Sequence, residues 1–247
     1  MEKTTDIIFI GSGKGGVGKS TITAFLGKSL SGKGKKTLII DSDSGLGAMD
    51  ILLKASDKVM NTWLDVSENG CSVSSAAIKI TEKLFLLPAP RFFPQELNEN
   101  ALKDVVSLCK GEYDCILIDG SAGIDRGFAM CLKAANRCIF VATADEISVK
   151  CACSAADRAN ELGFDGENIR IVINRFEKKA AQKSRLLNID GVIDKSGVML
   201  LGVVPFDKSI AYSSVTGKYP PPKSRFMKAV DRIARRTDGE YIPLRLD

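Results

Sequence analysis

The segment that most constrains the fold is glycine-rich and spans residues 11–21, with the sequence GSGKGGVGKST. The apolar run Ile7–Ile10 precedes it, and a stretch with helical period, Lys19–Lys33, follows it. A strand, a glycine-rich turn and a helix in this order are typical of a phosphate-binding loop. The glycines let successive backbone N–H groups turn toward a phosphate, and the helix N-terminus adds partial positive charge. The segment therefore predicts a nucleotide site on an α/β sheet.

Two side chains at the end of this loop carry specific chemistry. Lys19 is placed to reach the β- and γ-phosphates, and the Ser20 hydroxyl is placed to ligate Mg²⁺. A glycine-rich turn that only caps a helix is the alternative, and the strand–loop–helix order argues against it. The residues expected to contact the nucleotide through the loop are Gly13, Lys14, Gly15, Gly16, Val17, Gly18, Lys19, Ser20 and Thr21.

The rest of the chain alternates apolar runs of strand length with longer stretches of helical period. The runs lack polar alternation, as do strands that are covered on both faces. They are Thr37–Asp41, Leu84–Leu87, Cys115–Asp119, Cys138–Val141, Ile169–Ile173 and Val198–Val204. The later helical stretches are Glu99–Lys110, Asp145–Leu162 and Ser224–Arg236. We expect an α/β fold, a single doubly wound, mostly parallel twisted sheet with helices on both faces, in one domain over residues 1–247.

Composition narrows the function classes. The chain is 45% hydrophobic and 26% charged, and no apolar run approaches the roughly 18–20 residues of a membrane-spanning helix. Its polar N-terminus does not resemble a signal peptide, so we expect a cytoplasmic protein. Seven cysteines, an odd number mostly in apolar surroundings, predict buried free thiols. The absence of histidine excludes Ser–His and Cys–His catalysis and histidine-based metal sites. A net charge of +5 permits an acidic partner without requiring one.

Carboxylates follow two of the predicted strands. Asp41 ends the strand Thr37–Asp41, and Asp43 lies two residues later, on the same side of an extended backbone. Asp119 follows four apolar residues, which is the Walker B arrangement, in which a buried strand delivers one Asp to the Mg²⁺ shell. The carboxyl ends of parallel strands meet at the rim where α/β folds bind ligands. The alternative for Asp41 and Asp43 is a pair of solvated loop carboxylates.

The second lysine of the loop, Lys14, makes the motif unusual. The sequence Lys-Gly-Gly-Val-Gly-Lys-Ser resembles the deviant Walker A loop of the MinD/ParA family of ATPases. Further matches follow in order along nearly the whole chain, among them residues 86–89, 172–175 and 201–205. The stretch Gly-Leu-Gly-Ala-Met-Asp at residues 45–50 resembles the MinD branch more than ParA. The resemblance implies a P-loop ATPase that binds ATP and Mg²⁺ and hydrolyses ATP slowly, as a switch.

The resemblance also implies roles for individual residues. Lys14 would reach across an ATP-bound homodimer to the other subunit's nucleotide, where it would act as an arginine finger does. Asp41 would hold hydrated Mg²⁺ together with Ser20 and Asp119. Asp43 would position or activate the attacking water.

The second switch and the base site follow from the same resemblance. Residues 120–125 read Gly-Ser-Ala-Gly-Ile-Asp, where MinD usually has Ser-Pro-Ala-Gly-Ile-Glu. Losing that proline loosens the loop, because proline fixes φ. Two strand ends would frame the adenine, through the Asn174 amide beside Arg175 and through backbone groups between Pro205 and Asp207. A strand-terminal Asn is also a common turn residue, which is the alternative for Asn174.

The last helix admits two interpretations. The stretch Lys223–Arg236 is basic with an apolar stripe, which is compatible with a membrane or nucleic-acid surface. We favour a helix packed on the sheet with a solvated basic back, because the stripe is only wide enough for a core contact. The tail after Arg236 contains a proline and a terminal Asp. It therefore argues against a membrane-docking helix at the C-terminus, which MinD proteins of division-site placement usually carry.

A Cys-x-Cys pair, Cys151 and Cys153, raises the question of a metal site. The two side chains lie about 200° apart around a helix, so one helix cannot turn both thiols to the same ion. We expect core packing instead, along a stripe made of Ile147, Cys151, Ala155, Ala159 and Leu162.

The leading hypothesis is a MinD-like ATPase, an ATP-dependent dimerisation switch for division-site or flagellar placement. Its expected partners are a second copy of itself and an unidentified protein that stimulates hydrolysis. A ParA-type DNA-partitioning ATPase is one alternative, with DNA contact less favoured than a protein partner. An ATPase that delivers a metal or an iron–sulfur cluster is the other.

Overall fold

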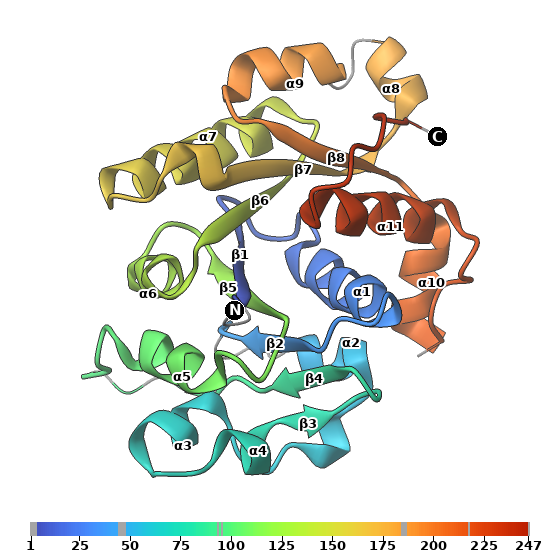
Figure 1. Cartoon of the computed structure of the whole chain (residues 1–247). Coiled ribbons are helices and arrows are strands. Elements are labelled where there is room, and N and C mark those ends of the chain that lie inside the picture. The colour runs from blue at the N-terminus through green and yellow to red at the C-terminus, as the bar shows by residue number, and fades with distance from the viewer. Residues whose placement is uncertain are drawn as a thin grey trace.

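The computed structural model describes residues 4–43, 48–92, 94, 96–183, 187–216 and 218–246. These residues form an eight-stranded sheet with the order β3-β4-β2-β5-β1-β6-β7-β8 (Figure 1). Neighbouring strands are parallel except β3 and β4, which pair antiparallel. The strands are β1 Asp6–Ser12, β2 Thr37–Asp41, β3 Ile78–Lys79, β4 Leu84–Leu87, β5 Cys115–Ala122, β6 Arg137–Thr143, β7 Ile169–Phe176 and β8 Leu200–Pro205.

Helices cover both faces of this sheet (Figure 1). One face carries α1 Lys19–Gly32, α2 Ala48–Leu53 and α11 Arg225–Thr237. The other carries α3 Trp63–Glu68, α4 Val73–Ala76, α5 Ala101–Cys109, α6 Arg126–Ala134, α7 Glu146–Glu161 and α9 Ile189–Ser196. Two further helices, α8 Lys178–Gln182 and α10 Lys208–Thr216, lie in connections after β7 and β8.

The apolar runs of the sequence are explained by these two layers. In β1, Ile7 and Phe9 belong to the core on one side of the sheet, and Ile8 and Ile10 to the core on the other side. A strand that is covered on both faces needs apolar residues at successive positions. The predicted fold class, a doubly wound and mostly parallel sheet with helices on both faces, is confirmed.

Some elements differ from the prediction. The strand predicted to end at Asp119 continues to Ala122, and the last strand begins at Leu200 rather than Val198. The edge strand β3, Ile78–Lys79, and most of the shorter helices were not predicted. These elements are short, so tertiary contacts rather than a long apolar period hold them in place. The Gly45-Leu46-Gly47 element lies outside the described residues.

The stripe predicted for α7 is correct at Ala155 and Ala159, which are buried, and wrong at its other three positions. Ile147 and Leu162 are 67% and 42% exposed, and Cys151 is only half-buried. The buried side chains of α7 are instead Ser148, Val149, Ala152, Ala155, Ala156 and Ala159. The core face is therefore rotated toward the small residues, because alanines let the helix lie close to the sheet.

Four of the seven cysteines are buried, and all seven are free. Cys109, Cys115, Cys131 and Cys138 lie in the core, whereas Cys71, Cys151 and Cys153 are half-buried. Burial raises the pKa of the Cys131 thiol to about 12, so this thiol stays protonated and unreactive at neutral pH. The prediction of free thiols is confirmed, whereas the prediction that the thiols are buried is correct only for these four core cysteines.

The last helix packs on the sheet, as we favoured from the sequence. Phe226, Val230 and Ile233 of α11 are buried against α1 and β8. Arg236 departs from the expected solvated basic back, because its guanidinium donates to the backbone carbonyls of Leu201, Ile242 and Pro243. No helix in the described ranges is long and apolar enough to cross a bilayer.

Candidate nucleotide site

The glycine-rich loop lies at the carboxyl end of β1, between that strand and α1, at the edge of the sheet where α/β folds bind ligands. It borders a cavity of about 620 Å³. Gly18 has a φ of 92°, and an added Cβ would lie 2.4 Å from the Asn174 amide nitrogen. Only glycine fits both conditions. The predicted residues that line the cavity are Gly15, Gly16, Val17, Gly18, Lys19, Ser20, Thr21, Asp43 and Arg175.

Lys19 is the buried cation of this site. Its side chain is 6% exposed, and its Nζ lies 3.1 Å from Asp119 Oδ2 and 3.8 Å from Asp43 Oδ2. The Nζ also donates to the Ser20 hydroxyl over 3.2 Å. Because a buried charge is stable only when paired, these carboxylates hold the ammonium at the start of α1. The structure thus brings together the lysine, the serine and the carboxylates that the sequence predicted at one rim.

Two carboxylates lie side by side below the loop. Asp41 and Asp119 are register partners in the adjacent parallel strands β2 and β5, and both are buried. Burial and, next to it, the Asp119 charge raise the pKa of Asp41 to about 7. The Asp43 backbone N–H donates to Asp41 Oδ1 over 3.0 Å, which partly opposes that shift. A cation bound beside the pair would favour the charged form of both carboxyl groups.

This donor set fits a divalent cation. Carboxylate and hydroxyl oxygens are the ligands that Mg²⁺ prefers, with waters and substrate phosphates completing the shell. Within the described residues, no group of three or more Cys, Asp or Glu side chains is placed to hold a metal ion. Asp41, Asp119 and Ser20 would accordingly supply only part of a shell, as in nucleotide sites rather than in all-protein cages.

Asp119 has a partner that sequence reasoning missed. The Thr23 hydroxyl donates to Asp119 Oδ1 over 2.7 Å, so both carboxylate oxygens are engaged, one by Thr23 and one by Lys19. Thr23 lies four residues after Lys19 and therefore on the same face of α1. This four-residue spacing is visible in the sequence and is the signal that would place Thr23 beside Lys19.

Asp43 lies between the loop and the second switch. Asp43 is half-buried, and burial raises the pKa of its carboxyl group. The Lys19 charge lowers this pKa, whereas the charges of Asp119 and Asp125 raise it. The second switch, residues 120–125, begins within the last three residues of β5. Its Gly120 lies against the Phe9 ring, where an added Cβ would be 2.4 Å away. Glycine at position 120, where the family usually has serine, therefore leaves room for the Phe9 ring of β1. Asp125 caps α6 by accepting the Phe128 N–H.

Lys14 points away from this buried cluster. Its side chain is 42% exposed, and its Nζ lies 3.4 Å from Asp145 Oδ1. Asp145 is the N-cap of α7 and accepts the Ser148 N–H. Burial would raise the pKa of Asp145, but hydrogen bonds from Thr143 and Ser148 and the Lys14 charge hold it below its usual value. The sequence did not single out Asp145, because this contact joins residues 131 positions apart.

The loop is also packed against α7 through Gly13. An added Cβ at Gly13 would lie 2.1 Å from the Cys151 carbonyl oxygen, closer than any real contact. Gly13 and Lys14 therefore lie against α7 at one side of the cavity rather than among its lining residues.

A smaller pocket of about 220 Å³ adjoins the loop where the base was expected. Asn174, Arg175 and Asp207 line it with Gly18 and Thr21, whereas Pro205 ends β8 and is not a lining residue. Two rings complete the pocket, the half-exposed Phe206 and the buried Phe226. The sequence did not reveal these rings, which supply the flat apolar faces that a base stacks on.

The side chains of Asn174 and Asp207 in this pocket are already engaged. The Asn174 amide nitrogen donates to the Val17 carbonyl over 2.8 Å, and its oxygen accepts the Arg175 N–H over 2.9 Å. Arg175 has a φ of 54°, a left-handed conformation that is uncommon for a side chain of this size. Asp207 accepts the N–H groups of Ser209 and Phe226. Asn174 thus fastens the phosphate loop to β7.

Comparison with known proteins agrees with this geometry. The CobQ/CobB/MinD/ParA nucleotide binding domain family matches residues 8–220. The septum site-determining protein MinD of Thermotoga maritima is 34% identical over 98% of this chain and 91% of its own length. MinD in the MinC:MinD cell division protein complex of Aquifex aeolicus superposes with a TM-score of 0.90 at 29% identity, over 98% of each chain. MinD of Pyrococcus horikoshii, complexed with Mg-ADP, has a TM-score of 0.82 at 27% identity, over 95% of this chain and 96% of its own.

A doubly wound sheet with a phosphate loop and strand-end carboxylates defines a P-loop nucleotide-binding protein. The chain belongs to the CobQ/CobB/MinD/ParA nucleotide-binding family, and its relatives place it in the MinD branch.

Proposed function

We propose that this chain is a slow, Mg²⁺-dependent ATPase that acts as an ATP-dependent dimerisation switch in division-site or flagellar placement. The observation that carries the proposal is the contrast between the two lysines of one loop. Lys19 is 6% exposed among carboxylates, whereas Lys14 is 42% exposed at the edge of the cavity. A buried lysine serves the subunit's own phosphates, and an exposed one is available to a second subunit.

The roles inside one subunit follow from the contacts. On binding ATP, Lys19 would exchange its carboxylate partners for the β- and γ-phosphates, since both are charge-assisted contacts of the same kind. Ser20, Asp41 and Asp119 would hold Mg²⁺, which neutralises charge developing on the phosphates. Asp43 borders the cavity beside Lys19 and would orient or deprotonate the attacking water. Its raised pKa is suited to a proton acceptor.

The pocket at the end of β7 and β8 would take the adenine. Its rings, Phe206 and Phe226, offer apolar faces, and the neighbouring Gly18 and Thr21 connect it to the phosphate loop. Asn174 would contribute by fixing the loop, and Arg175 and Asp207 by shaping the pocket wall.

Dimerisation would depend on Lys14. In the single chain Lys14 pairs with Asp145. Both side chains are more than one-third exposed, so this ion pair is weak. A nucleotide on a second subunit would offer several phosphate charges in place of one carboxylate. Lys14 would then act in trans, as an arginine finger does.

The partner protein belongs to the same proposal. The Aquifex relative is found in a MinC:MinD complex, which supports a protein partner for this chain. The absence of a metal-holding cluster among the described residues gives the metal-delivery alternative no support.

Sedimentation velocity with ATP, ADP and no nucleotide tests the switch. We expect the parent chain to dimerise with ATP only. Lys14→Ala should bind ATP but lose about tenfold or more in dimer affinity, since one charge-assisted contact per site is lost. Lys150→Ala, at an exposed lysine of α7, is the control for removing a nearby charge. A Lys14→Ala dimer with parental affinity would contradict the cross-subunit role.

Asp145→Asn sharpens the same test. Asparagine keeps the helix cap but removes the negative partner of Lys14. We expect the ATP dimer of this variant to form at about threefold lower concentration, because a weak ion pair no longer competes. Tighter dimerisation in Asp145→Asn together with loss in Lys14→Ala would assign both effects to the lysine.

A further inference from the structure

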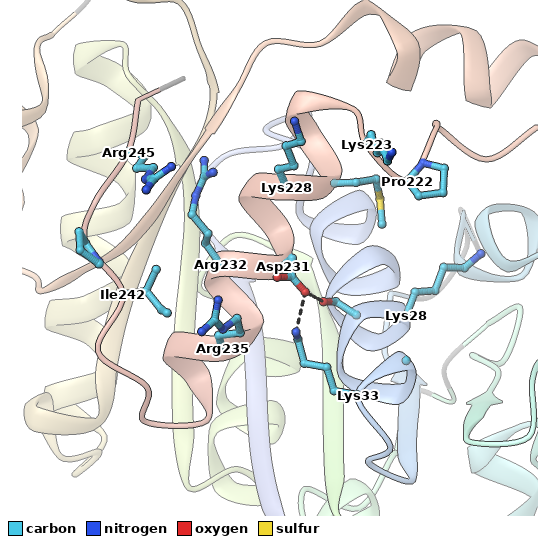
Figure 2. A pocket seen from close by; sticks show the side chains of 14 residues that line it. Lys28, Lys33, Pro222, Lys223, Lys228, Asp231, Arg232, Arg235, Ile242 and Arg245 are labelled. Atoms are coloured by element: carbon cyan, nitrogen blue, oxygen red, sulfur yellow. Dashed lines mark hydrogen bonds and ion pairs between the residues drawn. The ribbon is translucent and has the colours of Figure 1, made fainter.

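A groove of about 840 Å³ lies between α1 and α11 (Figure 2). None of its lining residues belongs to the phosphate loop. The carboxyl-terminal half of α1 forms one side with Lys28 and Lys33. The other side is α11 with the segment Pro222-Lys223 before it. Residues 242–245 close one end. Three separate segments of the chain thus build one concave surface.

The tail is held in place as a wall of this groove. Arg236 donates through Nε to the Ile242 carbonyl over 2.9 Å and through Nη2 to the Pro243 carbonyl over 2.8 Å. Arg235 pairs with Glu240 over 2.7 Å. Because these bonds fix the backbone of the tail, Ile242 and Pro243 present their apolar side chains to the groove.

The groove is strongly cationic. Seven of its fourteen lining residues are Lys or Arg, and one, Asp231, is acidic. Asp231 accepts from Lys33 over 2.7 Å and so neutralises a single charge (Figure 2). Across the described part of the chain, no carboxylate lies within ion-pair distance of Lys223, Lys228 or Arg245. Lys28 adds less positive charge than the others at neutral pH, because burial and the neighbouring Lys54 lower its pKa to about 7. A cluster of this kind attracts a negatively charged ligand.

Apolar residues lie between these cations. Pro222, Met227, Ile242 and Pro243 all line the groove. None of the lining residues is aromatic, whereas single-stranded nucleic acid is bound mainly by aromatic platforms on which its bases stack. A bilayer surface is bound by a projecting basic and apolar face rather than by a concave one. The mixture of cations and aliphatic side chains fits a peptide that carries both acidic and apolar residues.

We propose that the groove between α1 and α11 docks an acidic segment of a protein partner, with apolar side chains of that segment against Met227, Ile242 and the two prolines. This inference goes beyond the proposed switch, because the groove is complete in one subunit and involves no nucleotide.

Fluorescence anisotropy tests the proposal without nucleotide, so its failure is separate from failure of the switch. The probe is a fluorescein-labelled peptide of repeating Glu-Glu-Leu triplets. We expect the parent to bind it and the double variant Lys223→Glu/Lys228→Glu to lose affinity by about tenfold or more, since two favourable charges become repulsive. Both residues are exposed, so the variant should melt at the parental temperature.

The matched control is Lys103→Glu/Lys150→Glu, which makes the same charge change at exposed lysines of α5 and α7. We expect its affinity for the peptide to stay within about twofold of the parent. Equal loss in the control, or no binding by the parent, would overturn the docking site. Tighter binding of labelled oligo(dT), with the same loss in the groove variant, would assign the groove to nucleic acid and refute the peptide.

Discussion

Two clusters of charged residues involve the same helix, α1, and they differ in burial and in the balance of charge. At the start of α1, Lys19 is 6% exposed and touches Asp119 and Asp43. Toward the end of α1, Lys28 and Lys33 line the groove together with Lys228 of α11 and Lys223 before it. The first cluster has an excess of carboxylates, and the second has a large excess of cations.

The difference shows how burial separates two uses of positive charge. In the first cluster, low exposure strengthens each interaction and fixes each side chain. Loss of one partner there would strongly destabilise the folded chain. In the second, water and salt weaken each contact, so affinity must come from many charges together. The first arrangement suits one small, highly charged ligand, and the second suits a long one.

The largest expected effect concerns the buried cluster. Lys19→Ala should lower ATP affinity by about 100-fold or more, because it removes the charge that pairs with the β- and γ-phosphates. Isothermal titration calorimetry measures this loss. The variant also leaves Asp119 buried without its cation, so a thermal melt must accompany the titration. Lys33→Ala, at the other end of α1, should bind ATP as the parent does. Parental affinity in Lys19→Ala would refute the phosphate-loop assignment.

The next effect separates binding from hydrolysis within the same cluster. Asp43→Ala should keep ATP binding and lower the turnover rate by about 100-fold, the range expected for loss of a positioned proton acceptor. Phosphate release under single-turnover conditions measures the rate. Asp57→Ala, at an exposed carboxylate of the turn Ser56–Lys58, is the control. Weaker ATP binding with unchanged turnover of bound ATP would contradict the role of Asp43.

A smaller effect concerns the partly buried lysine of the groove. Burial and the Lys54 charge lower the pKa of Lys28 to about 7, while the faces of Phe25 and Tyr219 favour its charged form. Between pH 7 and the ordinary pKa of 10.5, the unfolded chain holds a proton here that the folded chain lacks. This group therefore makes stability rise with pH across that window.

Lys28→Met should remove that dependence. We expect the free energy of unfolding of the variant, relative to the parent, to be about 1 kcal/mol higher at pH 7 than at pH 10, a value reduced for partial solvent screening. Urea unfolding at the two pH values measures it, and Lys150→Met is the control. A constant difference between variant and parent would show that Lys28 keeps an ordinary pKa.

For membrane binding, we expect no effect of ATP. Residues 240–245 are fastened to α11 by Arg235 and Arg236 instead of forming a helix, and the apolar face of α11 is buried. The 247-residue chain with ATP should therefore stay in the supernatant when centrifuged with anionic vesicles. ATP-dependent sedimentation with the vesicles would show that the packed helix can expose that face.

The fold and the central cluster could be predicted because both depend on short patterns. Apolar runs without alternation mark doubly covered strands, and the carboxyl ends of such strands meet at one rim. That is why Lys19, Asp41 and Asp119 could be placed together before any coordinates were known. The spacing within α1 held the information for Thr23 as well, although it was not used.

What could not be predicted depends on how elements meet. A helical period gives the width of a stripe on α7, but which stripe faces the sheet depends on the small side chains of Ala152 and Ala156. The pairing of Lys14 with Asp145 and the ring of Phe226 beside Gly18 depend on segments that are far apart in the chain. The groove likewise needs the end of α1, the whole of α11 and the tail to come together.

The contact between Gly13 and the backbone of Cys151 has a genetic consequence. Every single-base change that replaces a glycine with another amino acid adds a Cβ, and here that atom would lie 2.1 Å from a carbonyl oxygen of α7. Every single-base change of codon 13 that replaces the glycine would therefore force the loop or α7 to shift, so descendants of this gene should retain the glycine. The opposite side of the contact involves only the backbone and Cβ of Cys151. Alanine or serine preserves both, so a change of Cys151 to either residue should leave this contact unaltered.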